Sequence, residues 1–207
     1  MDRGYIYLNK KSYLHNIEVL KNLSRKELCL VVKANAYGHG LEWAVKNAKE
    51  SGVKWFAVAS VDEGIEVKKV YGDSRALLLA EPSITQLDNV KENNIDLTIY
   101  NESFIDTLIE TGDEFSVHLK IDTGMHRLGC PPEKFHVLYK KIVDSNLNLI
   151  GICTHFPLAD TDENETKKSI ELFEKTISDI DSTNMLLHLS LIHISEPTRP
   201  LYISYAV

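Results

Sequence analysis

The chain has 207 residues, of which 43% are hydrophobic and 26% are charged, and its net charge is −7. This composition is typical of a soluble globular domain, and no apolar run approaches the about 20 residues of a membrane span. An acidic chain without a basic stripe does not suit nucleic acid, so the partner we expect is a small molecule. The start of the chain lacks the apolar region of a signal peptide, and the three cysteines have neither metal nor disulfide spacing, which predicts a cytoplasmic protein.

Short apolar runs alternate along the chain with longer segments of helical periodicity, such as 41–48, 138–143 and 170–177. Asn101 precedes a further helical segment as a cap. A repeated strand and helix predicts a parallel sheet with helical crossovers, and a (β/α)₈ barrel is the natural closure of such an α/β fold. The expected strands are residues 28–32, 55–59, 76–80, 96–100, 116–121, 149–154 and 185–189.

Lys33 closes the first apolar run, within the sequence VVKANAYGHG (31–40), and opens a loop rich in Ala, Asn and Gly. Burial at a strand end disfavours the charged ammonium form and leaves an amine nucleophile. Schiff-base chemistry with an aldehyde cofactor requires such an amine. For the lysine taken alone, the alternative is a side chain that extends its ammonium group into solvent.

Polar residues also end the fifth and sixth expected strands: Lys120 and Asp122 stand at the end of one run, and His155 stands at the end of the next. In (β/α)₈ barrels the chemistry gathers at the carboxyl ends of the strands, so these side chains can converge on one site. Each of them singly is more often a structural group. Together, in loops with small residues that let a ligand approach, they favour a functional site. The remaining histidines are scattered, and we predict no metal site.

Three motifs, in order, make the chain resemble the alanine racemase family over about residues 5–190. VVKANAYGHG (31–40) resembles the family's cofactor-lysine motif, KIDTGMHRLG (120–129) its internal signature, and THFPLAD (154–160) the segment after the sixth strand. The resemblance implies a barrel followed by a C-terminal β domain, with pyridoxal 5'-phosphate as cofactor. It also implies an amino-acid racemase that interconverts L- and D-alanine for peptidoglycan precursors, as a homodimer without nucleic-acid or membrane partners.

The resemblance assigns roles to individual residues. Lys33 would be the catalytic residue, binding pyridoxal 5'-phosphate as a Schiff base and then acting as one of two acid/base groups. Tyr37 would hydrogen-bond the cofactor phosphate, and Arg127 would contact the ring hydroxyl and the substrate. His155 would belong to the shell around the pyridine nitrogen.

Lys120 would face Arg127, in many family members as a carbamate whose negative charge orients the arginine. The alternative is an ordinary salt bridge between Lys120 and Asp122 or another carboxylate. In the family the second base is a tyrosine from the C-terminal domain of another subunit, and this sequence has no counterpart for it. We therefore expect the polypeptide as written to be inactive or nearly so as a racemase.

The resemblance ends after Ser190, where the family continues with an Asn-Ser-Ala loop that binds the cofactor phosphate. This chain instead reads LIHISEPTRPLYISYAV (191–207), in which two prolines prevent a helix. We interpret residues 1–190 as an incomplete barrel of about seven strands without the C-terminal β domain. Residues 191–207 are interpreted as a non-homologous tail from a sequencing or assembly artefact, and the alternative is a genuine tail whose residues 201–205 add a makeshift eighth strand.

Other functions stay open beside the alanine racemase. A serine racemase of the same family is one, because substrate choice depends mainly on contacts in the absent part. A single-domain protein that binds pyridoxal 5'-phosphate and manages its supply is another, favoured by chain length but opposed by Lys120, Arg127 and His155 in their racemase-like context. The third is an α/β barrel with an unknown ligand.

Overall fold

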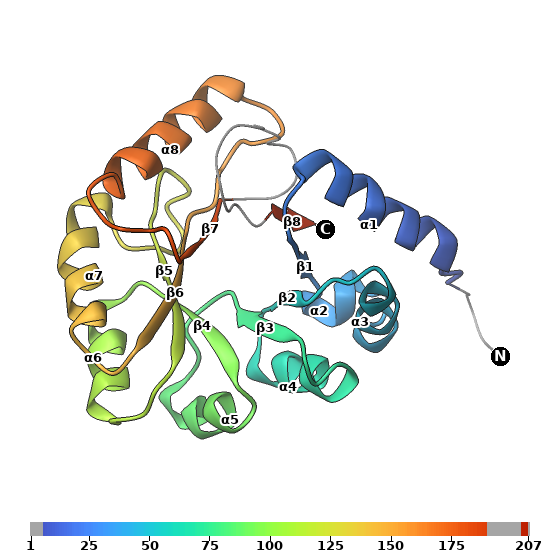
Figure 1. The fold of residues 1–207 in the computed structure, drawn as a ribbon, viewed down its shortest axis with the longest axis horizontal. Coiled ribbons are helices and arrows are strands. Elements are labelled where there is room, and N and C mark those ends of the chain that lie inside the picture. Colours follow the sequence, from blue (N-terminus) through green and yellow to red (C-terminus); the bar gives the residue numbers. More distant parts are fainter. Residues whose placement is uncertain (1–5, 190–203, 207) are drawn as a thin grey trace.

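The computed structural model describes residues 6–189 and 204–206, in which parallel strands follow one another around a curled sheet (Figure 1). Each strand from β1 to β7 pairs with the next one in the chain, and β8 pairs in parallel with the free side of β1. The strands are β1 (Leu28–Val31), β2 (Trp55–Val58), β3 (Arg75–Leu78), β4 (Ile95–Ile99), β5 (Ser116–Lys120), β6 (Asn148–Cys153), β7 (Leu186–His188) and β8 (Ser204–Ala206).

The fold is the predicted incomplete (β/α)₈ barrel, and every expected apolar run forms a strand whose ends lie within two residues of the expected ones. β7 and β8 stand at the two ends of the sheet order, so among the described residues no strand pairing closes the barrel. β8 lies beside β1 and overlaps the alternative eighth strand of residues 201–205 only at residues 204 and 205. The interpretation of the remaining tail falls on residues 190–203 and 207, which lie outside the described part.

Helices cover the outer face of the curled sheet (Figure 1). Asn101 caps α6 as predicted, because its side chain accepts a hydrogen bond from the Ser103 N–H. α8 begins three residues before the expected position near 166, because the Asp162 side chain caps it by accepting from the Glu165 N–H. The helices are α1 (Lys10–Ser24), α2 (Lys33–Tyr37), α3 (Leu41–Glu50), α4 (Val61–Val70), α5 (Leu87–Glu92), α6 (Glu102–Glu110), α7 (Phe135–Val143) and α8 (Glu163–Thr176), with short 3₁₀ segments η1 (Ile84–Gln86) and η2 (Pro132–Lys134).

Both faces of the sheet are buried, which explains why the strands read as continuous apolar runs. The larger core cluster joins the outer face of the strands to the helices, with members such as Phe56, Leu97 and Phe135. A smaller cluster consists only of strand residues on the inner face of the curl, including Cys29, Trp55 and Leu77. No helix in the described part is long and apolar enough to cross a membrane.

Candidate active site

The five residues predicted for the site meet at the carboxyl end of the barrel. Lys33 and His155 follow β1 and β6, Lys120 is the last residue of β5, and Arg127 lies in the loop after β5. Burial, the largest cause, and the nearby positive charges of Lys120, Arg127 and Lys33 together lower the pKa of the His155 imidazole to about 4. Tyr37 lies beside Lys33, whose Nζ is 6.0 Å from the centre of the tyrosine ring.

Lys33 is presented by an uncommon backbone conformation. It is half-buried, and the residues after it form one left-handed helical turn, with φ of 52° at Ala34, 54° at Asn35 and 51° at Ala36. A left-handed helix brings Cβ too close to the following carbonyl and costs about 1–2 kcal/mol per residue. The sequence predicted an irregular loop here. The turn ends at Gly38, which has a φ of 86° and donates its N–H to the Ala34 carbonyl.

Contacts of Asn35 hold this turn in place. The Asn35 N–H donates to Glu63 Oε1 at 3.3 Å, and the Asn35 side-chain oxygen accepts from the Leu41 N–H at 2.7 Å. The second oxygen of Glu63 accepts from the Ala59 N–H at 2.9 Å. The Glu63 carboxylate therefore joins the loops after β1 and β2, and the strained turn is fixed by its neighbours.

Lys120 is the buried lysine of the site, with 8% of its surface exposed. Burial is the largest cause of the lowered pKa of its amine, and the charges of Arg127 and Lys33 act in the same direction. The Asp122 carboxylate is engaged elsewhere, because one of its oxygens accepts the N–H groups of Gly124 and His126 at 3.0 Å each. Among the described residues Lys120 forms no ion pair with a carboxylate, although Asp122 is near enough for its charge to act against the lowering of the Lys120 pKa.

The loop that carries Arg127 folds back onto the end of β5. The Lys120 carbonyl accepts from the Cys130 N–H at 2.8 Å, and the Cys130 carbonyl accepts from the Asp122 N–H at 2.9 Å. Gly129 lets the two backbones approach, since a Cβ on it would lie 2.6 Å from the Asp122 nitrogen, and its φ of 137° also favours glycine. The two hydrogen bonds join the beginning and the end of the loop, and Arg127 between them is exposed.

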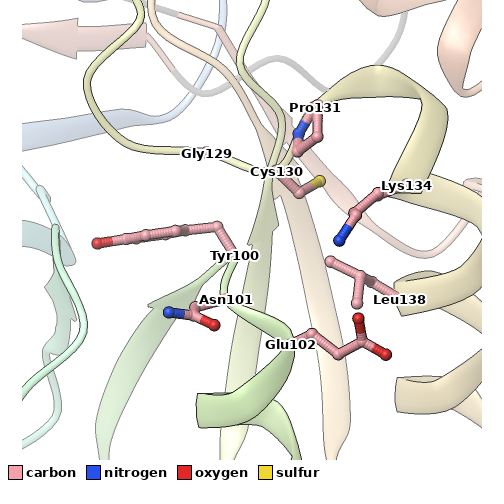
Figure 2. Close-up of a pocket in the computed structure, with 8 residues that line it drawn as sticks. All are labelled: Tyr100, Asn101, Glu102, Gly129, Cys130, Pro131, Lys134 and Leu138. Atoms are coloured by element: carbon pink, nitrogen blue, oxygen red, sulfur yellow. The ribbon is translucent and has the colours of Figure 1, made fainter.

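A cavity of about 280 Å³ lies between the end of β4, the end of this loop and α7 (Figure 2). It is smaller than the ligand pockets of about 300–1,000 Å³ common in proteins. None of the five predicted site residues lines it, so it is separate from the candidate site. Its lining residues are Tyr100, Asn101, Glu102, Gly129, Cys130, Pro131, Lys134 and Leu138.

Two buried histidines pair inside the barrel, and no sequence motif indicates this pair. His118 of β5 and His188 of β7 are 70 residues apart, and His118 Nδ1 lies 2.8 Å from His188 Nε2. Burial, followed by the charge of Arg75, lowers the pKa of His118 to about 3. Burial also lowers the pKa of His188, with further contributions from His118 and Lys120. No three or more metal-binding side chains gather in the described residues.

Comparison with known proteins gives one consistent relationship. A family model described as the alanine racemase N-terminal domain matches residues 8–196. The alanine racemase of Treponema denticola is 35% identical over 202 residues, which covers 92% of this chain and 52% of that protein. An amino-acid racemase of Enterococcus faecalis is 34% identical over 182 residues, which covers 85% of this chain and 26% of that protein. The chain thus spans about half the length, or less, of these relatives.

Solved structures agree with this relationship. The alanine racemase of Clostridium difficile superposes with a TM-score of 0.85 at 26% identity, covering 94% of this chain and 55% of that one. The alanine racemase of E. faecalis has a TM-score of 0.89 at 24% identity, covers 97% of this chain and 57% of that one, and supports the fold alone. Because the family match extends over residues 8–196, the chain belongs to the alanine racemase family and contains its N-terminal domain.

Proposed function

We propose that this chain is the cofactor-binding barrel of a pyridoxal 5'-phosphate-dependent alanine racemase, a cytoplasmic enzyme that interconverts L- and D-alanine for peptidoglycan precursors. The observation that carries the proposal is that Lys33, Lys120, Arg127 and His155 lie within range of one another's charges at one end of the barrel, in a chain of this family. That end of a (β/α)₈ barrel is where catalytic groups gather.

The residues at this end fit the proposed cofactor. Lys33 is half-buried at a strand end, so an aldehyde can reach its amine. The positive charge of Arg127 nearby suits a cofactor that carries a phosphate and a phenolic oxygen. When bound, pyridoxal 5'-phosphate supplies an electron sink that makes the proton on the substrate's Cα removable. Lys33 would hold the cofactor covalently through Nζ and, once released, move a proton at Cα on one face.

The other residues would orient the cofactor. Tyr37 is 45% exposed beside Lys33, which leaves its hydroxyl accessible to a phosphate. Arg127 would donate to the ring hydroxyl and to the substrate carboxylate. With a pKa of about 4, His155 is a neutral imidazole at pH 7, so it can take part in hydrogen bonds without adding positive charge near the pyridine nitrogen.

A carbamate on Lys120 is part of the proposal. The uncharged amine attacks the carbon of CO₂, an N–C bond forms and a proton leaves, so that a buried cation becomes an anion facing Arg127. The lowered pKa of Lys120 raises the fraction of reactive amine. In the presence of ¹³C-labelled bicarbonate, a carbamate NMR signal is expected that Lys120→Ala removes and that Lys46→Ala, at an exposed position on α3, retains. A native chain without this signal would rule out the carbamate.

Racemisation needs proton-moving groups on opposite faces of the substrate, and Lys33 serves one face. By the resemblance, the second group belongs to the C-terminal domain of a partner subunit, which lies outside the N-terminal domain that matches residues 8–196. We therefore expect the 207-residue polypeptide, assayed by itself, not to racemise alanine. Measurable racemisation of alanine or serine by the purified chain would contradict this expectation and would also report its substrate preference.

Addition of pyridoxal 5'-phosphate tests the site directly. The native chain should develop a visible absorbance band typical of an imine, and Lys33→Ala should abolish it. Lys46→Ala is the matched control, because it removes an exposed lysine of α3 and should leave the band intact. A folded chain that develops no band would favour a barrel with another ligand, and a band that persists in Lys33→Ala would remove Lys33 from the proposal.

A further inference from the structure

Polar side chains occupy part of the inner face of the curled sheet. Thr98 of β4 and His118 of β5 are register partners on adjacent strands, and both are buried, with 2% and 0% of their surfaces exposed. The His118 ring also packs edge-to-face against Trp55, a member of the inner apolar cluster, with 5.8 Å between the ring centres. Both polar side chains are therefore enclosed in the barrel and removed from bulk solvent.

One edge of the His118 ring has a partner. Its Nδ1 pairs with His188 Nε2 at 2.8 Å, across the intervening strand β6. Gly151 makes this crossing possible, because a Cβ at that position would lie 2.2 Å from His118 Nδ1. Because Nδ1 is engaged on the side of β7, the ring directs Nε2 the other way, into the barrel interior.

His118 Nε2 and Thr98 Oγ1 have no hydrogen-bond partner among the described residues. A buried polar atom without a partner loses its hydrogen bonds to water and gains none in return. Neighbouring strands lie about 5 Å apart, and two hydrogen bonds of about 2.8 Å each can span such a gap through one small molecule. Two unpaired polar atoms on neighbouring positions thus point to a shared occupant.

We propose that the barrel interior contains a buried water-binding site between Thr98 Oγ1 and His118 Nε2. Water fits because it both donates and accepts, whichever nitrogen of the neutral His118 carries the proton. The water, His118 and His188 would then form an uncharged polar chain inside the barrel whose last member lies within range of the Lys120 charge. This inference concerns the interior of the fold and does not depend on the proposed function.

Thr98→Val tests the site, because valine has the shape of threonine without the hydroxyl. If water bridges the two atoms, the variant deprives the water of one partner and should lower the melting temperature. If the interior is dry, the variant removes an unsatisfied hydroxyl and should raise the melting temperature. Thr98→Ser is the matched control, since it keeps the hydroxyl and should keep the water.

A high-resolution crystal structure of the native chain decides the question even if a variant does not fold. We expect a solvent peak within about 3 Å of both Thr98 Oγ1 and His118 Nε2, retained in Thr98→Ser and lost in Thr98→Val. A direct hydrogen bond between Thr98 and His118 would overturn the proposal. So would a native interior without solvent density at this place.

Discussion

Gly151→Ala is expected to destabilise the chain strongly, because Gly151 gives His118 the room to reach His188. The added Cβ would lie 2.2 Å from His118 Nδ1 and 2.9 Å from the Leu186 carbonyl oxygen. Overpacking of a core typically costs about 1–3 kcal/mol. If the His118 ring turns away instead, a buried hydrogen bond is lost, which costs about 1–3 kcal/mol when it leaves a partner unsatisfied.

We therefore expect the free energy of unfolding of Gly151→Ala to fall by about 3 kcal/mol, measured by urea denaturation with circular dichroism. For a chain of this size, such a loss corresponds to a decrease in melting temperature of about 6–12 °C. Gly72→Ala is the matched control, since its Cβ would meet no atom closer than the Lys68 carbonyl at 3.9 Å. That variant should leave the stability unchanged or raise it by about 0.4–1 kcal/mol.

Removal of the His118 ring separates its contact with position 151 from the contact with the Leu186 carbonyl oxygen. In a His118→Ala background the ring is absent, and Gly151→Ala should cost at least about 1 kcal/mol less than in the native chain. An equal cost in both backgrounds would refute the claim that Gly151 makes room for the histidine. It would leave the contact with the Leu186 carbonyl oxygen as the cause.

The unfolding free energy should fall as the pH drops from about 6.5 toward 3, because the unfolded chain binds protons that buried His118, with its pKa lowered to about 3, does not bind. His118→Asn should reduce this slope by about 1.4 kcal/mol per pH unit, and an unchanged slope would contradict the assignment. Ala34→Gly should raise the unfolding free energy by about 0.5–1 kcal/mol, because glycine relieves the left-handed strain at some entropic cost. By contrast, Ala44→Gly in the right-handed helix α3 should lower the unfolding free energy by about 1 kcal/mol. Glu63→Gln should speed amide hydrogen exchange in residues 33–37, because glutamine has one acceptor oxygen for two N–H groups, while Glu66→Gln on the same helix should not.

The strands could be predicted because both faces of the sheet are buried and their sequences are continuous apolar runs. The location of the site followed from the same pattern, since Lys33, Lys120 and His155 each interrupt an apolar run where a strand ends. The carboxyl ends of parallel strands lie at one end of a barrel, so residues that end different strands are expected to lie close together.

Other features depend on tertiary contacts that a linear pattern does not contain. The left-handed turn after Lys33 reads as a loop in sequence, and contacts with Glu63 on the next helix help hold it. The pairing of His118 with His188 requires strands that are far apart in the chain, and Gly151, which permits it, looks like any glycine in a strand. The sequence places Asp122 two residues from Lys120 and does not show that Asp122 accepts backbone N–H groups instead of forming an ion pair with the lysine.

We propose that Lys33 is the residue that binds pyridoxal 5'-phosphate. Borohydride reduction of the loaded chain, followed by peptide mass spectrometry, identifies the lysine that holds the cofactor. We predict that the label is on Lys33 and that Lys120, buried and a few residues from Arg127, stays unlabelled. A label on Lys120 or on surface lysines, with Lys33 unmodified, would contradict the account.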